Sequence, residues 1–320
     1  MAETLRGSKW AHGLWARGWV RDLLAVLFLV TLVLLFFWPI LTPNPLARGS
    51  FLPGDFISQF YAFNRVASKQ LLQGKLPLWN PHSYSGHPFL ADPQAAVFYL
   101  PSLLTMLLGA SWNVPVFALE LEAVAHFCIA ALFTYAFARR VIEQRAGALV
   151  TAVALTFGGY LTGYPPLQLS ILKTVVWLPL VLLGLEAGTQ RMAASHPRPW
   201  CAFMGAGLAL GMAILAGHPQ TAMYILYASL AYGLFRTWWV RHRRRAVACL
   251  AIFVLVGLGL SAAQWLPSLE YALLSSRAGM TYQDHSGGLP LIELRHMVLV
   301  NRSPVYAGVL PLILALTAIG

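Results

Sequence analysis

Seven long apolar stretches constrain this chain more than any other feature of its sequence. A helix that crosses the hydrocarbon core of a bilayer, about 30 Å thick, needs roughly 17 to 25 apolar residues. The stretches that approach or reach this length cover residues 23–41, 114–138, 147–164, 169–185, 200–216, 221–235 and 246–266. Only 10% of the residues are charged and 58% are hydrophobic, whereas a soluble domain carries about 25% charged residues. The sequence therefore predicts an all-α, polytopic helical membrane protein.

The end of the sequence and its cysteines refine this expectation. An eighth apolar stretch begins near Val305 and is still running at Gly320, so we expect seven complete spans, part of an eighth, and a truncated chain. The three cysteines, Cys128, Cys201 and Cys249, lie inside apolar stretches. A disulfide framework is therefore not expected.

The positive charges gather between alternate apolar stretches. Four groups hold 14 of the 22 Lys and Arg residues and four of the 11 acidic residues, which gives them ten of the eleven net positive charges. Their basic members are Arg6, Lys9, Arg17, Arg21, Arg139, Arg140, Arg145, Arg191, Arg198, Arg236, Arg241, Arg243, Arg244 and Arg245. Because cytoplasmic loops are enriched in Lys and Arg, we assign these groups and the N-terminus to the cytoplasm. Residues 1–22 are then a cytoplasmic N-terminal segment, and residues 23–320 are a transmembrane domain. Because nearly all of the net positive charge is explained by this orientation, we expect no nucleic-acid partner.

The same assignment defines two loops on the outer side, over residues 42–113 and 267–304. The first contains residues 95–109, which we keep outside because a span there would move the basic group at 139–145 to the outer side. This stretch has Pro101 near its middle, and we expect a helix that lies at the membrane interface or dips partway into the membrane. A second outside helix is expected over residues 57–72, where apolar and polar residues alternate with helical spacing and Gly74 provides a stop.

Asp55, just before that helix, is the first candidate for chemistry. Its carboxylate is able to cap the helix by accepting from free backbone N–H groups. Alternatively it acts as a general base that takes a proton from an acceptor hydroxyl, with Gln59 one turn further along the same face. Both interpretations remain open at this point.

The segment that follows is rich in proline and glycine and carries several polar or aromatic candidates. Trp79, Asn80, His87, Asp92 and Gln94 offer an aromatic platform and hydrogen-bonding groups suited to a sugar. The competing interpretation is a rigid loop whose Trp79 anchors it at the interface. The spacing of the histidines and carboxylates fits no known metal site, and we expect neither a metal nor a cofactor.

Lys173 and Arg277 are the remaining binding candidates. Lys173 lies four residues into an apolar stretch, where it either snorkels to the interface or contacts a lipid phosphate. Arg277 either pairs with Glu270 or binds a phosphate with its two parallel donors. Glu122 and His126, at i and i+4, are expected to form an internal polar cluster rather than a catalytic set.

Three motifs in the first outside loop resemble the YfhO-like family of bacterial membrane proteins. They read G-D-F-I-S-Q-F-Y from residue 54, L-L-Q-G-K-L-P-L-W-N-P from residue 71 and G-H-P-F-L-A-D-P-Q from residue 86. That family is similar to the C-type glycosyltransferases, whose shared module has an acidic residue after the first span and two juxtamembrane helices outside. The resemblance implies that Asp55 is the acidic residue and that residues 57–72 and 95–109 are the two helices.

The function implied by this resemblance is transfer of a sugar from a polyprenyl-phosphate carrier to a cell-envelope glycan or lipid acceptor. The reaction would be an inverting displacement at the outer face of a bacterial cytoplasmic (inner) membrane, with Asp55 as base. The alternative is a transporter or lipid-carrier scaffold without catalytic activity. Paired broken helices would favour transport.

Overall fold

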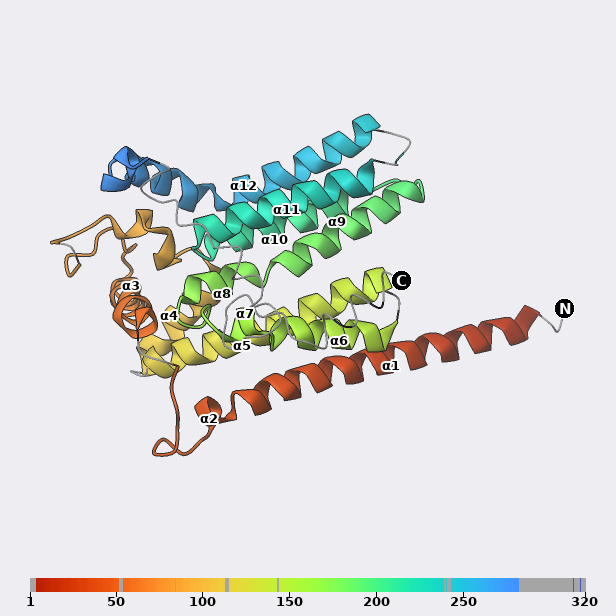
Figure 1. The fold of residues 1–320 in the computed structure, drawn as a ribbon, viewed down its shortest axis with the longest axis horizontal. Helices are drawn as coiled ribbons and strands as arrows, with labels where there is room; N and C mark the ends of the chain where they lie inside the picture. The colour runs from red at the N-terminus through yellow and green to blue at the C-terminus, as the bar shows by residue number, and fades with distance from the viewer. Residues whose placement is uncertain are drawn as a thin grey trace.

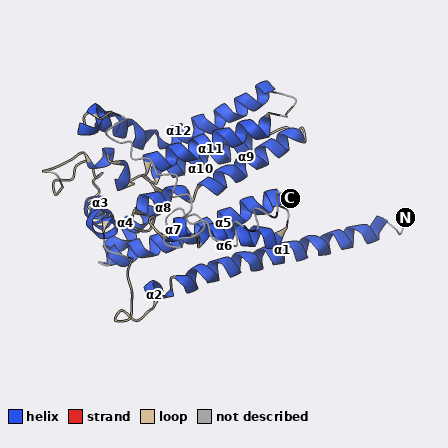
Figure 2. Cartoon of the chain, in the orientation of Figure 1, coloured by secondary structure: helices blue, strands red, loops and turns tan. Residues whose placement is uncertain are grey.

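The computed structural model describes residues 4–51, 54–83, 85–112, 115–142, 144–238, 240, 243–281, 313 and 317, with only the backbone described for 4–17, 109–112, 115 and 277. These residues form helices and no strand (Figure 2). The helices are α1 Thr4–Phe36, α2 Trp38–Leu41, η1 Phe56–Tyr61, α3 Ala62–Leu72, α4 Leu100–Trp112, α5 Pro115–Ile142, α6 Arg145–Thr156, α7 Gly159–Thr162, α8 Leu169–Val175, α9 Leu178–Ala193, α10 Trp200–Leu215, α11 Pro219–Thr237 and α12 Arg243–Leu273. Short 3₁₀ turns cover Phe89–Ala91 (η2), Pro93–Ala95 (η3) and Ser276–Gly279 (η4).

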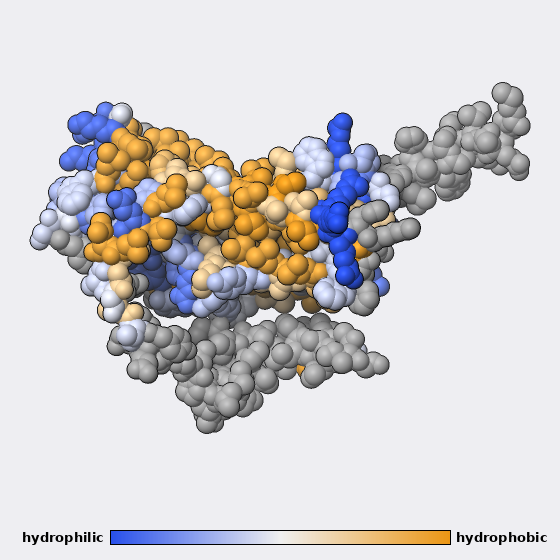
Figure 3. Space-filling view, turned by 90° about the horizontal axis from the view of Figure 1, so that it is seen from above, coloured by the Kyte–Doolittle hydropathy of each residue, from blue (hydrophilic) through white to orange (hydrophobic). Residues whose placement is uncertain are grey.

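Four helical segments in the described part of the chain are long and apolar enough to cross a membrane. They are Gly18–Phe36, Val116–Ile142, Leu169–Ala193 and Arg243–Leu273. An apolar band lies between two polar ends of the molecule (Figure 3), as a bilayer requires. The expected all-helical membrane architecture is therefore confirmed in outline, while the expected count of seven complete spans is not. The eighth apolar stretch falls outside the described residues, apart from single positions.

The helices run side by side around two apolar cores. One core joins α1, α5, α6 and α8 through residues such as Leu29, Phe127 and Leu172. The other joins α9 to α12 through residues such as Leu185, Phe203 and Phe253. These two cores hold the long helices parallel or antiparallel to one another (Figure 1).

Glycines set the close packing of α10 against α12. A Cβ atom on Gly207 would lie 2.6 Å from the Phe253 carbonyl oxygen, and one on Gly211 would lie 2.7 Å from a Leu260 methyl carbon. The two glycines are four residues apart on one face of α10. Small residues at this spacing let helix backbones approach in the way common in membrane proteins.

The described members of the four basic groups lie on segments at one end of the bundle, as the charge pattern predicts. The start of α1, the α5–α6 turn and the α9–α10 and α11–α12 connections share that end (Figure 1). Asp22 of α1 pairs there with Arg145 at 2.8 Å, and Glu186 of α9 pairs with Arg236 of α11 at 2.6 Å. The acidic residues at this end therefore tie together helices that are distant in the sequence.

The helix pair predicted to lie outside is found at the opposite end of the bundle (Figure 1). The helix expected over residues 57–72 is present as two consecutive pieces. The π-helix η1 covers Phe56–Tyr61, and the α-helix α3 continues from Ala62 to Leu72. It ends at Leu72, and Gly74, two residues beyond, adopts a φ of 69° and donates its N–H to the Leu71 carbonyl. Figure 1 views α3 end-on, so this helix lies across the direction of the long helices.

Two expected boundaries are wrong. Residues 95–99 are not part of the second outside helix, which is α4 and begins at Leu100, so that Pro101 lies in its first turn. Proline is tolerated there because first-turn N–H groups need no helical partner. Likewise, the last described long helix does not end at Leu266 but continues through Pro267 to Leu273. The final part of α12 turns away from its first part (Figure 1), as an internal proline causes.

Candidate functional site

Asp55 is held by a residue from a distant part of the chain. Its side chain makes no capping hydrogen bond to the helix that follows it, so the capping interpretation is wrong. Instead, the Nε2 of Gln168 donates a hydrogen bond to the Asp55 Oδ2. Gln168 directly precedes α8, and its amide therefore connects the first outside loop to the third candidate span.

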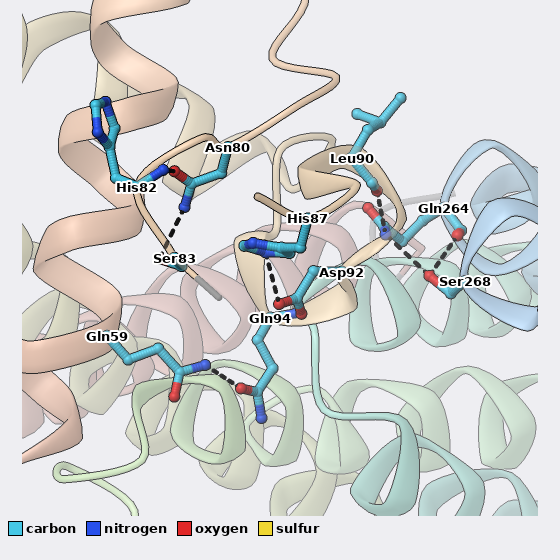
Figure 4. A network of polar contacts seen from close by, with 10 residues as sticks. All are labelled: Gln59, Asn80, His82, Ser83, His87, Leu90, Asp92, Gln94, Gln264 and Ser268. Atoms are coloured by element: carbon cyan, nitrogen blue, oxygen red, sulfur yellow. Dashed lines mark hydrogen bonds and ion pairs between the residues drawn. The ribbon is translucent and has the colours of Figure 1, made fainter. Parts of the chain in front are cut away.

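Gln59 and Gln94 meet next to this carboxylate. Gln59 lies four residues after Asp55 in η1, and its Nε2 donates to the Gln94 Oε1. The backbone N–H of Gln94 in turn donates to the Asp92 Oδ1 at 2.9 Å. Figure 4 shows these side chains as one line of contacts running from the π-helix into the loop.

Asp92 and His87 complete this line. The His87 Nε2 lies 3.6 Å from the Asp92 Oδ2, and the imidazole is buried against Phe63 and Phe89. Burial raises the pKa of the Asp92 carboxyl above its ordinary value, although the Gln94 N–H and His87 oppose this shift. The structure thus brings five of the predicted residues into one region, namely Asp55, Gln59, His87, Asp92 and Gln94.

Asn80 and Trp79 both make contacts that build the loop, Asn80 as a buried residue and Trp79 with 53% of its surface exposed. Asn80 is buried and forms an isolated antiparallel bridge with His87, with two backbone hydrogen bonds of 3.0 Å. The Asn80 side chain closes a turn by accepting from the His82 N–H and donating to the Ser83 hydroxyl. The Trp79 ring packs so closely on Gly86 that a Cβ there would lie 2.6 Å from it. These contacts favour the rigid-loop interpretation for both residues.

A second glycine fixes this loop against the bundle. Gly217, at the end of α10, has a φ of 98°, and a Cβ on it would lie 2.4 Å from the Pro93 carbonyl oxygen. On the opposite side, the Gln264 Nε2 of α12 donates to the Leu90 carbonyl at 3.0 Å (Figure 4). Residues 87–94 are therefore held between η1, α10 and α12.

Lys173 is buried and does not snorkel. Its side chain is 6% exposed, and its Nζ lies 2.8 Å from the Glu122 Oε1 of α5. The ammonium also donates to the Ser102 hydroxyl of α4 at 2.8 Å, and that hydroxyl donates to the same carboxylate oxygen at 2.6 Å. Contact between Lys173 and a lipid phosphate therefore requires this ion pair to open.

The expected polar cluster around Glu122 and His126 is larger than its two members. The His126 Nδ1 lies 2.6 Å from the Glu122 carbonyl, which only accepts, so Nδ1 carries the proton. The neutral ring then accepts from the Tyr99 hydroxyl through Nε2 at 2.7 Å, and that hydroxyl accepts from the Trp177 Nε1 at 2.9 Å. Each of these contacts has a matching donor and acceptor.

The residue that sequence reasoning missed is Gln168, together with the small helix α8 that follows it. From this region Gln168 binds Asp55, Lys173 binds Glu122, and the Thr174 hydroxyl accepts from the His218 N–H. The only sequence feature that could have indicated Gln168 was its position as a polar residue directly before an apolar stretch. For Arg277 only the backbone is described, in the turn after α12, so its role as a phosphate ligand stays a prediction.

A pocket of about 240 Å³ is lined by Leu167, which directly precedes Gln168 in the chain, although neither Gln168 nor Asp55 lines it. Its wall comes from the end of α1, from the residues that precede Asp55 and from the segment that leads to Gln168. The lining residues are Phe36, Phe37, Ile40, Ser50, Phe51, Thr162, Gly163, Pro166 and Leu167. The pocket is therefore largely apolar, and among the described residues Ser50 and Phe51 are its only lining residues from the loop that contains Asp55.

Comparison with known proteins does not identify a family for this chain. No protein-family model, no curated protein and no solved structure matches the chain.

Proposed function

We propose that the protein is a membrane glycosyltransferase of the YfhO-like type, which moves a sugar from a polyprenyl-phosphate carrier to a cell-envelope acceptor on the outer face. The observation that carries this proposal is the Asp55 carboxylate. It is not used as a helix cap, it is oriented by Gln168, and it directly precedes η1, which leads into α3 at the end of the bundle away from the basic groups. A carboxylate held in this way suits a general base.

In the proposed reaction, an acceptor hydroxyl oxygen attacks the anomeric carbon of the donor sugar. The bond from that carbon to the carrier phosphate oxygen breaks, and the phosphate leaves with the electron pair. Asp55 takes the proton of the acceptor hydroxyl. The amides of Gln59 and Gln94 offer hydrogen bonds to sugar hydroxyls beside it.

The apolar pocket that includes Leu167, the neighbour of Gln168 in the chain, supports a lipid substrate. Its phenylalanine, isoleucine and leucine side chains provide a surface on which an isoprenoid chain is able to pack. Leu167 of this pocket directly precedes Gln168, which binds Asp55. A donor with a sugar head and an isoprenoid tail needs an apolar surface of this kind close to polar groups.

Incubation of the protein with labelled polyprenyl-phosphate sugars tests this function. We expect free carrier lipid to be released with wild-type protein, and to a far smaller extent with Asp55→Asn. Absence of release for every donor, in the presence of envelope acceptors, would refute the transferase.

A transporter or lipid-carrier scaffold is the second candidate, and two breaks in the helices favour it. Helix α6 stops at Thr156 before the short α7, and α8 stops at Val175 before α9. The buried Lys173–Glu122 pair lies beside the second break. Transporters use discontinuous helices around a polar centre. Movement of intact carrier lipid across a vesicle membrane, without sugar release, is the result that this candidate predicts.

A further inference from the structure

A second pocket, lined mainly by polar residues, lies between α3 and the turn that contains Pro81 and His82. It has a volume of about 340 Å³ and is lined by Arg65, Val66, Lys69, Gln70, Gln73, Pro81 and His82. The buried face of α3 consists of Phe63, Asn64, Ala67 and Ser68, whereas Arg65 and Lys69 are exposed. Neither Asp55 nor any other residue of the proposed transferase site lines this pocket.

The side chains that line this pocket give it a positive charge. Arg65 and Lys69 are one helical turn apart, so their charges lie on the same side of α3. None of the lining residues is acidic, and the sequence contains no Asp or Glu between Asp55 and Asp92. In the described part of the chain, no carboxylate pairs with either cation.

The wall opposite the two cations is fixed by hydrogen bonds. The Gln70 Nε2 donates to the Trp79 carbonyl at 3.1 Å, which ties the loop to α3. The His82 N–H donates to the Asn80 Oδ1 at 2.9 Å, and Asn80 is itself buried and bridged to His87. His82 is therefore positioned by the backbone of a rigid turn rather than carried on a free loop.

We propose that this pocket binds the phosphate group of a phosphate ester. Arg65 presents a planar fork that matches two phosphate oxygens, Lys69 adds a compact charge, and His82 and Gln73 add N–H donors. Unpaired cations at the surface are ordinarily solvated, but here two of them line a concave pocket of the size that small ligands occupy. That volume exceeds a bare phosphate, so the ligand carries an organic group, either a soluble one or the glycerol of a lipid headgroup.

Three single substitutions test the proposal, because each removes one positive charge from the same segment. Arg65→Gln and Lys69→Gln alter the pocket, whereas Lys75→Gln alters an exposed residue just beyond α3 that does not line it. The full chain in neutral detergent is titrated with glycerol 1-phosphate by calorimetry. In parallel, short-chain phosphatidylglycerol is added and the bound lipid is counted by native mass spectrometry.

We expect saturable binding of at least one probe, weakened about tenfold or more by Arg65→Gln and by Lys69→Gln, as for loss of a charge-assisted hydrogen bond. Lys75→Gln should change affinity less than about twofold, because an exposed charge away from the pocket is screened by salt. Binding of glycerol 1-phosphate assigns a soluble ester, and binding of the lipid alone assigns a headgroup. If neither probe saturates, or if all three variants lose affinity equally, the pocket is not a phosphate site.

Discussion

Gln168 donates its side-chain N–H to the carboxylate of Asp55, across 113 positions of sequence. The same carboxylate accepts no capping hydrogen bond from the N–H groups of the helix that it precedes. A capping aspartate contacts only its own helix, whereas Asp55 connects the first outside loop to the segment before α8. Because no cap bond is involved, a substitution of Asp55 can test its proposed role as a base directly.

Replacement of Asp55 by asparagine should separate folding from catalysis. Asparagine still accepts a hydrogen bond from Gln168, and no cap bond is lost, so we expect thermal unfolding to change little. If Asp55 is the general base, turnover should fall by about 10² to 10⁴. Carrier-lipid release measured on the same preparations compares the two effects. A variant that inserts normally and keeps most of its activity would move the search to Asp92, Glu270 or residues beyond the described part.

The ion pair between Lys173 and Glu122 should behave as a unit. Lys173→Gln leaves a buried carboxylate without its cation, and we expect a loss of about 3 to 5 kcal/mol in stability. Adding Glu122→Gln removes that stranded charge and should recover part of the loss. A double-mutant cycle on detergent-solubilised protein, followed by thermal unfolding, measures the coupling. Additive effects of the two substitutions would contradict a direct pair.

Gly217→Ala should destabilise the attachment of the first outside loop. The new Cβ would lie 2.4 Å from the Pro93 carbonyl oxygen at a backbone φ of 98°, and strain of this kind costs about 1 to 3 kcal/mol. Gly205→Ala is a matched control, since no atom lies within 4 Å of its Cβ position in α10. There, alanine should stabilise the helix by about 0.5 to 1 kcal/mol. Equal unfolding temperatures for the two variants would argue against the Pro93 contact.

Stability should depend on pH through Asp92. Burial raises the pKa of this carboxyl above its ordinary value of 3.8, so the folded state holds the proton more tightly than the unfolded state. Its contribution to stability is therefore full below pH 3.8 and is lost as pH rises through the raised pKa. Asp92→Asn keeps an acceptor for the Gln94 N–H and removes the titration. Comparing the unfolding temperatures of both proteins from pH 3.5 to 7 should reveal a difference in slope; parallel curves would show that Asp92 does not contribute.

Cysteine labelling should find the two polar ends on opposite sides of the membrane. Lys75 lies in the first outside loop and Arg198 between α9 and α10, and both side chains are exposed. In a background without Cys128, Cys201 and Cys249, an impermeant maleimide should label Lys75→Cys in intact cells. It should label Arg198→Cys only after permeabilisation. The reverse pattern would invert the predicted orientation, and labelling of both from one side would contradict the topology.

Local sequence was sufficient for the all-helical membrane architecture and for predicting which ends of the helices lie together. Apolar stretches specify membrane helices because unpaired backbone groups are too costly in hydrocarbon. Arginine groups between them predict which ends share a side, and the structure gathers those groups at one end. The helix after Asp55 and its stop at Gly74 also follow from neighbouring residues, because spacing and a glycine with positive φ act within one or two turns.

Only the tertiary structure determined what the polar side chains do. Asp55 has the same local sequence whether it caps its helix or accepts from Gln168, and Lys173 is equally compatible with snorkelling and with a buried pair. The choice depends on which helices pack together, since a polar group removed from water takes the partner that packing brings within hydrogen-bonding distance. Those partners, Gln168 for Asp55 and Glu122 for Lys173, are dozens of residues away in the chain. The residues next to Asp55 and Lys173 in the sequence therefore do not indicate these partners.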